Sequence, residues 1–179
     1  MKILGIDPGT RATGFGIIEF QNNAIRHIES GTIFSATNDG SSSLTKIFAG
    51  IETIIQKHRP SAIAVEEVFF ATNVKSALKL GQVRGVILLA VLRSRTTFYE
   101  YSPLEVKKAV TGYGRADKRQ VQLMTMRLLH LTSYPHTADA SDALAVAICH
   151  AHNMRRWESA HGKEELHGQV RQEKNKRKI

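Results

Sequence analysis

The amino-acid sequence predicts one α/β domain followed by a basic tail. Short apolar segments alternate with longer segments in which apolar residues recur at intervals of three or four. Two of the short segments, residues 3–7 and 62–66, each end in a carboxylate. At 179 residues, 42% of them apolar, the chain is long enough for a single domain with a real core. We expect a mixed five-stranded sheet flanked by helices.

The first three strands are expected to form an antiparallel meander. Residues 3–7 are a short apolar run that Pro8 and Gly9 stop, which fits a buried strand better than a helix. Residues 13–20 and 24–34 are rich in strand-forming residues and are joined by a short polar connection. Asp7 is therefore expected at the carboxyl end of its strand.

A helix and a second strand that ends in an acid come next. Between residues 44 and 55 the apolar side chains recur at three and four, which predicts an amphipathic helix, and Pro60 ends it. Residues 62–66 repeat the pattern of the first strand. A strand reached through a crossover helix lies parallel in the same sheet, so Glu66 should emerge at the same end as Asp7.

The remainder of the chain is expected to be mainly helical. A strand at residues 98–101 is the exception, and helices are predicted for residues 74–93, from residue 102 to the break at residues 112–114, from 117 to about 131, and for 138–152. Gly81 and Gly85 lie four apart in the first of these helices, which indicates close approach by a neighbouring backbone, in this subunit or across a dimer. Asp139 and Asp142 share one face of the last helix.

The charge favours nucleic acid as a partner. Lys and Arg number 25 against 16 Asp and Glu, which gives a net charge of +9 and a pI near 9.9. Part of the excess lies in residues 153–179, where apolar periodicity is lost. We expect one folded α/β domain over residues 1–152 and a basic, flexible tail over residues 153–179.

Cys149 is the only cysteine, which excludes an intrachain disulfide and a thiolate metal cluster. The first apolar run is cut at Asp7, so no signal peptide is expected, and the longest later run, residues 86–92, is too short to cross a bilayer. We therefore expect a cytoplasmic protein with no membrane association.

Four acids, Asp7, Glu66, Asp139 and Asp142, are expected to meet at one end of the sheet. Like charges so close demand cations, and an oxygen-only cluster selects Mg²⁺ or Mn²⁺. Such clusters hold two ions about 3.5–4 Å apart and hydrolyse phosphodiester bonds by in-line displacement. Each acid alone fits an ordinary turn or helix cap, and it is the coincidence of four that favours a nuclease.

Several segments resemble the bacterial RuvC family of Holliday-junction resolvases. They are Ile6-Asp7-Pro8-Gly9-Thr10 with Thr13-Gly14-Phe15-Gly16, Val65-Glu66-Glu67-Val68-Phe69, the run from Ser76 to Gly85, and Ala138-Asp139-Ala140-Ser141-Asp142-Ala143-Leu144-Ala145. The resemblance runs in a consistent order from Met1 to about His152. It implies an RNase H-like fold, a homodimer, and symmetric nicking of four-way junction DNA in recombination and repair. It also implies dependence on Mg²⁺, with two ions per site and Mn²⁺ as a substitute, and cooperation with RuvA and RuvB.

The resemblance implies roles for individual residues as well. The four acids become the catalytic metal ligands. Lys107 and Lys118 match basic positions near the site and the DNA backbone, and Phe69 matches an aromatic wedge that stacks on an unpaired junction base. Glu67 adjoins Glu66, but adjacent residues of a strand point to opposite faces, so we leave Glu67 outside the metal site.

Other classes of protein remain open from the sequence. The Asp7-x-Gly9-Thr10 pattern also resembles the first phosphate loop of actin-like ATPases and sugar kinases, which need a second lobe that a 179-residue chain does not supply. A non-catalytic DNA-binding module would also explain the charge. A closer alternative is another RNase H-like nuclease, such as a YqgF-type RNA-processing enzyme.

Overall fold

A computed structural model of the chain describes residues 1–35, 40–67 and 74–161. The elements are β1 (Lys2–Asp7), β2 (Ala12–Gln21), β3 (Ala24–Phe34), α1 (Gly40–His58), β4 (Ala62–Glu66), α2 (Val74–Arg93), β5 (Thr97–Tyr101), α3 (Pro103–Thr111), α4 (Lys118–Leu128) and α5 (Ala138–His161). Their order is the one that the sequence predicts. No helix in the described ranges is both long enough and apolar enough to span a membrane.

The five strands form one mixed sheet in the order β3-β2-β1-β4-β5. β1, β2 and β3 are antiparallel neighbours, whereas β4 is parallel to β1 and β5 is parallel to β4. The predicted meander and crossover are therefore confirmed. Ile6 of β1 is the register partner of Val65 of β4, so Asp7 and Glu66 follow side by side at the carboxyl ends of the two strands.

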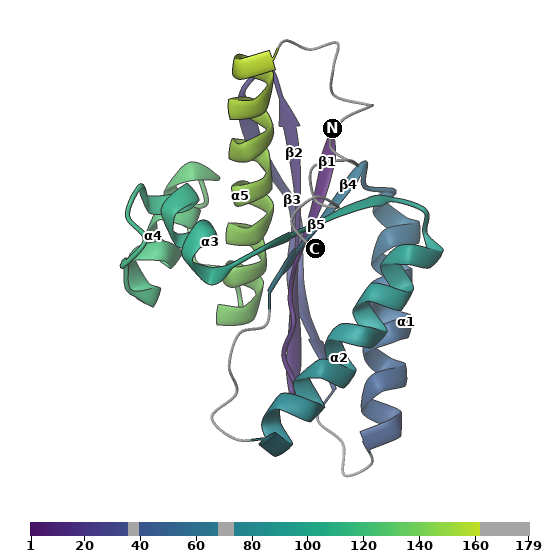
Figure 1. Cartoon of the computed structure of the whole chain (residues 1–179). Coiled ribbons are helices and arrows are strands. Elements are labelled where there is room, and N and C mark those ends of the chain that lie inside the picture. The colour runs from purple at the N-terminus through teal and green to yellow at the C-terminus, as the bar shows by residue number, and fades with distance from the viewer. Residues whose placement is uncertain (36–39, 68–73, 162–179) are drawn as a thin grey trace, which may run out of the picture.

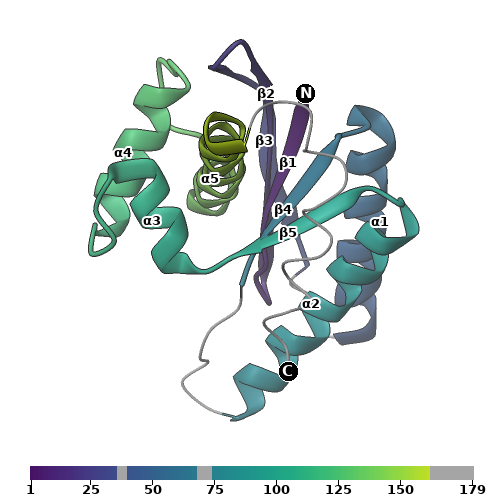
Figure 2. The ribbon, with the colours of Figure 1, turned by 45° about the horizontal axis from the view of Figure 1, so that its top comes forward.

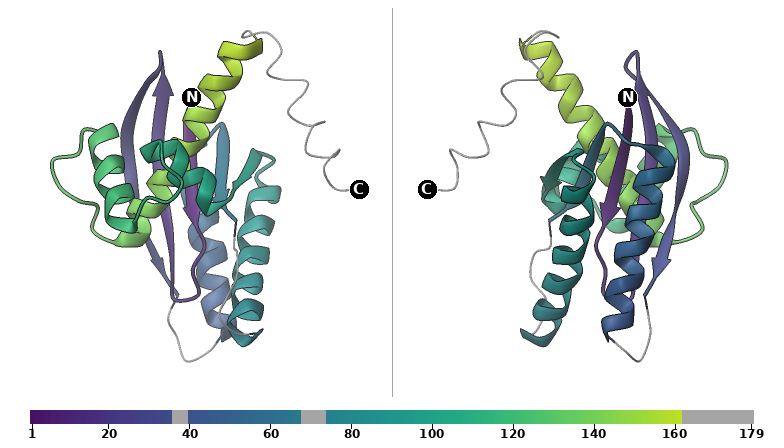
Figure 3. Two further views of the ribbon diagram at one scale, coloured as in Figure 1. Left: turned by 60° about the vertical axis from the view of Figure 1, so that its left-hand side comes forward. Right: turned by 90° about the vertical axis from the view of Figure 1, so that its right-hand side faces the viewer.

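Helices cover both faces of the sheet. Helix α5 lies against one face with α3 and α4 outside it, and α1 and α2 cover the other face (Figures 1 and 2). The views in Figure 3 show α1 and α2 side by side. Each face has its own apolar core, because alternate residues of every strand point to opposite sides.

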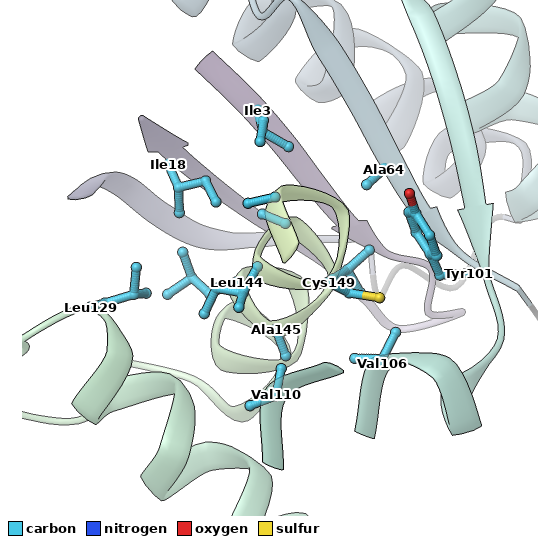
Figure 4. Packing of buried hydrophobic residues seen from close by; sticks show 14 of the residues in the cluster. Ile3, Ile18, Ala64, Tyr101, Val106, Val110, Leu129, Leu144, Ala145 and Cys149 are labelled. Atoms are coloured by element: carbon cyan, nitrogen blue, oxygen red, sulfur yellow. The ribbon is translucent and has the colours of Figure 1, made fainter. Parts of the chain in front are cut away.

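The core on the α5 side surrounds that helix almost completely. Ile3 and Ile18 of the sheet pack against Leu144 of α5, and all three are fully buried (Figure 4). Val110 of α3 and Leu129, directly after α4, add to this core from outside. Burying each such aliphatic side chain stabilises the fold by roughly 1.5–3 kcal/mol. This burial on both sides holds the first turn of α5 at the sheet.

The two short outer helices begin as their sequences predict. Ser102 and Glu105 form a reciprocal capping box at the start of α3, and Gly112 ends that helix in the left-handed conformation, with φ of 77°. Asp117 and Gln120 form the equivalent box at the start of α4.

The structure corrects two helix ends. α5 continues to His161 instead of stopping near His152, because no glycine or proline occurs after it begins until Gly162. The proposed division of the chain after residue 152 therefore lies within α5, and residues 162–179 lie outside the described ranges. α4 ends at Leu128, three residues before the predicted end, and His130 then takes φ of 52°.

The described part of the chain does not make the close packing that is expected at the two helical glycines. A Cβ atom added to Gly81 or Gly85 would meet nothing within 4 Å among the described residues. The buried side of α2 is instead formed by Val83, Ile87 and Val91. Within the described residues, the predicted contact inside the subunit is therefore not found, and the contact across a dimer stays a prediction.

Candidate active site

The four acids predicted from the sequence lie together at the carboxyl ends of the central strands. Asp7 ends β1, Glu66 ends β4, and Asp139 and Asp142 lie in the first turns of α5. The side chains of Asp7 and Glu66 share a hydrogen bond, and the charges of Asp142 and Asp139 both act on Asp7. Parts of the chain that are far apart in sequence therefore place four carboxyl groups in one cluster.

Burial and mutual repulsion change how readily these acids ionise. Burial, and after it the repulsion of the neighbouring carboxylates, led by Glu66, together raise the pKa of Asp7 to about 8. The pKa of Glu66 is also raised, chiefly by burial, although its hydrogen bond with Asp7 and the charges of Lys118 and Lys107 oppose the shift. At neutral pH the cluster therefore holds a proton between Asp7 and Glu66.

Both lysines singled out from the sequence lie beside the acids. The Nζ atom of Lys118 is 2.6 Å from Oδ2 of Asp142, and this ion pair raises the pKa of the lysine. Lys107 and Lys118 line an open pocket of about 210 Å³ together with Glu66 and Asp142. Its remaining lining is apolar and comprises Pro103, Val106, Val121 and Ala145. The pocket thus places the ammonium groups of two lysines beside the acid cluster.

Glycines in the sheet allow α5 to approach closely enough to bring its acids to Asp7. A Cβ atom on Gly14, the register partner of Asp7, would overlap the carbonyl oxygen of Asp139. A Cβ atom on Gly5 would overlap the carbonyl oxygen of Ala143, one turn further along α5. Only glycine leaves this space, so Gly14 helps to set the distance between Asp7 and Asp139. The glycine alternation in residues 14–16 is the sequence signal for this role.

A pair of threonines fixes the start of α5. The backbone N–H of Ala140 donates a hydrogen bond to Oγ1 of Thr137, which caps the helix, at 3.2 Å. Oγ1 of Thr137 is also hydrogen-bonded to Oγ1 of Thr32 on β3. The sequence reasoning did not identify this pair, although a threonine just before a predicted helix is a recognised cap signal.

The donor set fits hard divalent cations, although the acids are not arranged as the ligands of one ion. Across residues 1–35, 40–67 and 74–161, no three His, Cys, Asp or Glu side chains form a ready-made metal site. The carboxyl group of Asp7 is hydrogen-bonded to that of Glu66, and Asp142 forms an ion pair with Lys118. Oxygen is nevertheless the donor that Mg²⁺ and Mn²⁺ prefer. A cation would also relieve the repulsion that raises the pKa of Asp7.

Phe69 and Glu67 are the other two residues that the sequence singles out. Phe69 lies outside the described residues. The backbone N–H of Glu67 donates a hydrogen bond to the carbonyl oxygen of Tyr101 at 2.8 Å, which continues the contact of β4 with β5. The carboxylates that raise the pKa of Asp7 are Glu66, Asp142 and Asp139, and Glu67 is not one of them.

Comparisons with known proteins show the family of the chain. Residues 3–150 match the model of the family described as crossover junction endodeoxyribonuclease RuvC. The chain is 50% identical to the enzyme of that name from Rubrobacter xylanophilus over 154 residues, 86% of each chain. It is 52% identical to the one from Acinetobacter baylyi over 150 residues, 84% of this chain and 82% of the other.

Solved structures give the same result. Thermus thermophilus RuvC is 31% identical with a TM-score of 0.81, over 88% of this chain and 97% of the other. The same protein in complex with a Holliday junction substrate gives a TM-score of 0.82 at 31% identity, over 88% and 96% of the two chains. The yeast mitochondrial resolvase Ydc2, at 12% identity, 88% and 80% coverage and a TM-score of 0.66, shares the fold.

Proposed function

The chain belongs to the RuvC family of crossover junction endodeoxyribonucleases, and from this premise we propose that it resolves Holliday junctions by paired, symmetric nicks. Its fold is the RNase H-like fold of that family. The observation that carries the proposal is the convergence of four acids and two lysines at one end of the sheet. The reaction serves homologous recombination and DNA repair, and we place it in the cytoplasm.

The proposed chemistry is hydrolysis of a phosphodiester bond assisted by divalent metal ions. Asp7, Glu66, Asp139 and Asp142 would hold two Mg²⁺ ions, for which Mn²⁺ can substitute. When bound, such ions activate water and stabilise the leaving oxygen. The apolar lining of the pocket excludes water on one side of the acids and so strengthens the local electrostatic interactions.

Lys107 and Lys118 have a separate task in this proposal. Both line the pocket that contains Glu66 and Asp142, and Lys118 already neutralises one acid. Their positive charges would bind and orient the backbone phosphates of the strand that is cut, because a phosphate oxygen is a better partner for a lysine than bulk water. They would therefore contribute to both binding and cleavage.

A homodimer is part of the proposal, because two matched nicks need two acid clusters. A C2 dimer is the economical arrangement for a junction with two-fold symmetry. The outer face of α2 supports this interface: Leu78 is 67% exposed, Leu92 is 60% exposed, and Gly81 and Gly85 leave room for a second backbone. RuvA and RuvB are the further partners that we propose.

The test is cleavage of a labelled mobile four-way junction in the presence of Mg²⁺. Asp7→Asn, Glu66→Gln, Asp139→Asn and Asp142→Asn should each reduce cleavage by at least ~100-fold while junction binding persists, because each removes a metal ligand and not a phosphate contact. Asp117→Asn, a change at an exposed helix cap, is the matched control. Undiminished cleavage by one of the four variants removes that residue from the site.

The same assay separates the nuclease classes. Plain duplex and RNA substrates of equal length are run beside the junction, and nick positions are mapped at nucleotide resolution. Symmetric nicks at the junction alone support a resolvase. Preferred cleavage of RNA would indicate an RNA-processing nuclease instead.

A further inference from the structure

An exposed aromatic side chain lies at the same end of the sheet as the acids, on the edge strand. Phe34 is the last residue of β3 and is 67% exposed. A phenyl ring that is so exposed to water contributes little to the core. The partly buried core residues of β3 are Ile25, Ile28 and Ile33. The ring is therefore accessible to a ligand at this end of the sheet.

The strand register places Phe34 on the same face of the sheet as the acid cluster. Thr32 is the register partner of Gly14, and both face α5, since Thr32 bonds to Thr137 and Gly14 lies against Asp139. Side chains two residues apart on a strand share a face. Phe34, two residues beyond Thr32, is consequently on the α5 face, one step further out.

The spacing from the acids suits an extended nucleic-acid strand. β3 is the second strand from β1, so at 4.7–4.9 Å per strand it lies roughly 10 Å from the strand that carries Asp7. Nucleotides of one DNA strand rise about 3.4 Å each along the helix axis. Phe34 also lies two residues, roughly 7 Å, beyond the register position of Asp7, so it is a few nucleotides from a phosphate held at the acids.

A cation accompanies the ring. Arg11 is exposed and lies in the connection between β1 and β2. Its carbonyl oxygen accepts a hydrogen bond from the N–H of Ser35 at 3.0 Å, and the carbonyl oxygen of Thr10 accepts one from Oγ of Ser35 at 3.3 Å. These bonds tie the connection to the end of β3. No salt bridge joins Arg11 to another side chain in the described ranges.

Arg11 and Phe34 lie across the acids from the two lysines. Lys107 belongs to α3, which follows the opposite edge strand, β5, whereas Arg11 and Phe34 flank β2 and β3. A strand bound over the acids would therefore meet Lys107 on one side and Arg11 with Phe34 on the other. Thr10 and Arg11, in the connection that Ser35 ties to the end of β3, are both exposed and polar, which favours a nucleic-acid strand as the partner.

We propose that Arg11 and Phe34 form a second DNA contact, which we call the β3 edge. Arg11 binds a backbone phosphate, and Phe34 stacks on an unpaired base a few nucleotides from the cleaved bond. The inference rests on the proposed function and extends it. Because stacking on a phenyl ring requires a base that has left its pair, the β3 edge favours the open centre of a junction over intact duplex.

Binding measurements without divalent ions test the β3 edge apart from catalysis. The dissociation constant for a labelled four-way junction is measured in EDTA for wild type, Phe34→Ala, Phe34→Trp and Arg11→Ala. Phe34→Ala should weaken binding about 5- to 100-fold, and Phe34→Trp should stay within about twofold of wild type. Arg11→Ala should lower the slope of log K against log salt by about 1. Arg59→Ala, at an exposed arginine before β4, is the matched control.

The outcomes of these measurements distinguish failure of the β3 edge from failure of the proposed function. If the wild-type protein binds the junction and Phe34→Ala binds it with the same dissociation constant, the β3 edge is overturned and the proposed function stands. A loss of binding that follows a fall in the melting temperature of Phe34→Ala also overturns it, because the ring would then be structural. A wild-type protein that does not bind junctions overturns the proposed function and this inference together.

Discussion

Replacing Asp7 with asparagine should stabilise the protein in the absence of metal while it abolishes cleavage. The pKa of Asp7 rises from its ordinary value of 3.8 to about 8, led by burial and then by the repulsion of its neighbours. Asparagine has nearly the same size, cannot ionise, and can donate a hydrogen bond to Glu66. The substitution therefore removes an electrostatic penalty and leaves the packing unchanged.

The size of the effect follows from the pKa. In the unfolded chain Asp7 ionises above about pH 4, whereas in the folded protein it stays protonated up to about pH 8, so folding becomes less favourable as the pH rises between these values. At 1.36 kcal/mol per pKa unit the penalty is about 1.5 kcal/mol at pH 5 and about 4 kcal/mol at pH 7. For a domain of this size, removing it at pH 7 should raise the melting temperature by about 10 °C.

Thermal and urea unfolding in EDTA at pH 5, 7 and 8 measure this difference. The gap between Asp7→Asn and wild type should widen with pH. Asp117→Asn, at the exposed cap of α4, should show no such trend, because aspartate and asparagine cap helices about equally well. A variant that is less stable than wild type at pH 7, or a gap that does not change with pH, would refute the electrostatic account of the cluster.

Three further predictions concern positioning, assembly and the lysines. Gly14→Ala should weaken Mg²⁺ or Mn²⁺ binding, measured by the metal-induced rise in melting temperature, because its Cβ displaces Asp139. Wild-type metal binding by this variant would contradict the positioning role of Gly14. Leu78→Glu with Leu92→Glu should shift the protein from dimer to monomer in sedimentation experiments, and a double variant that stays dimeric moves the interface away from α2. Lys118→Ala should reduce junction affinity and cleavage more than Lys108→Ala, the exposed lysine of α3, and equal effects would make Lys118 an ordinary surface charge.

Local patterns were sufficient for most of the fold. Apolar periodicity, the Pro8-Gly9 stop and the Ser102–Glu105 capping box depend on residues close in sequence, and each element that they predict is present. α5 passes its predicted end at His152 because a change to polar composition does not by itself end a helix. Polar residues continue a helix readily when no glycine or proline intervenes.

The acids themselves could be chosen from the sequence, because Asp7 and Glu66 each end an apolar run and topology brings parallel strands to a common edge. Three other features could not be predicted from the sequence. They are the ion pair of Lys118 with Asp142, the proton that Asp7 keeps, and the fit of Gly14 against α5. These features depend on distances of a few ångströms between distant segments and on the water that packing removes. The sequence alone therefore determined which residues were available to the site. Tertiary structure decided their charges and their partners, because desolvation and close approach exist only once the helix lies on the sheet.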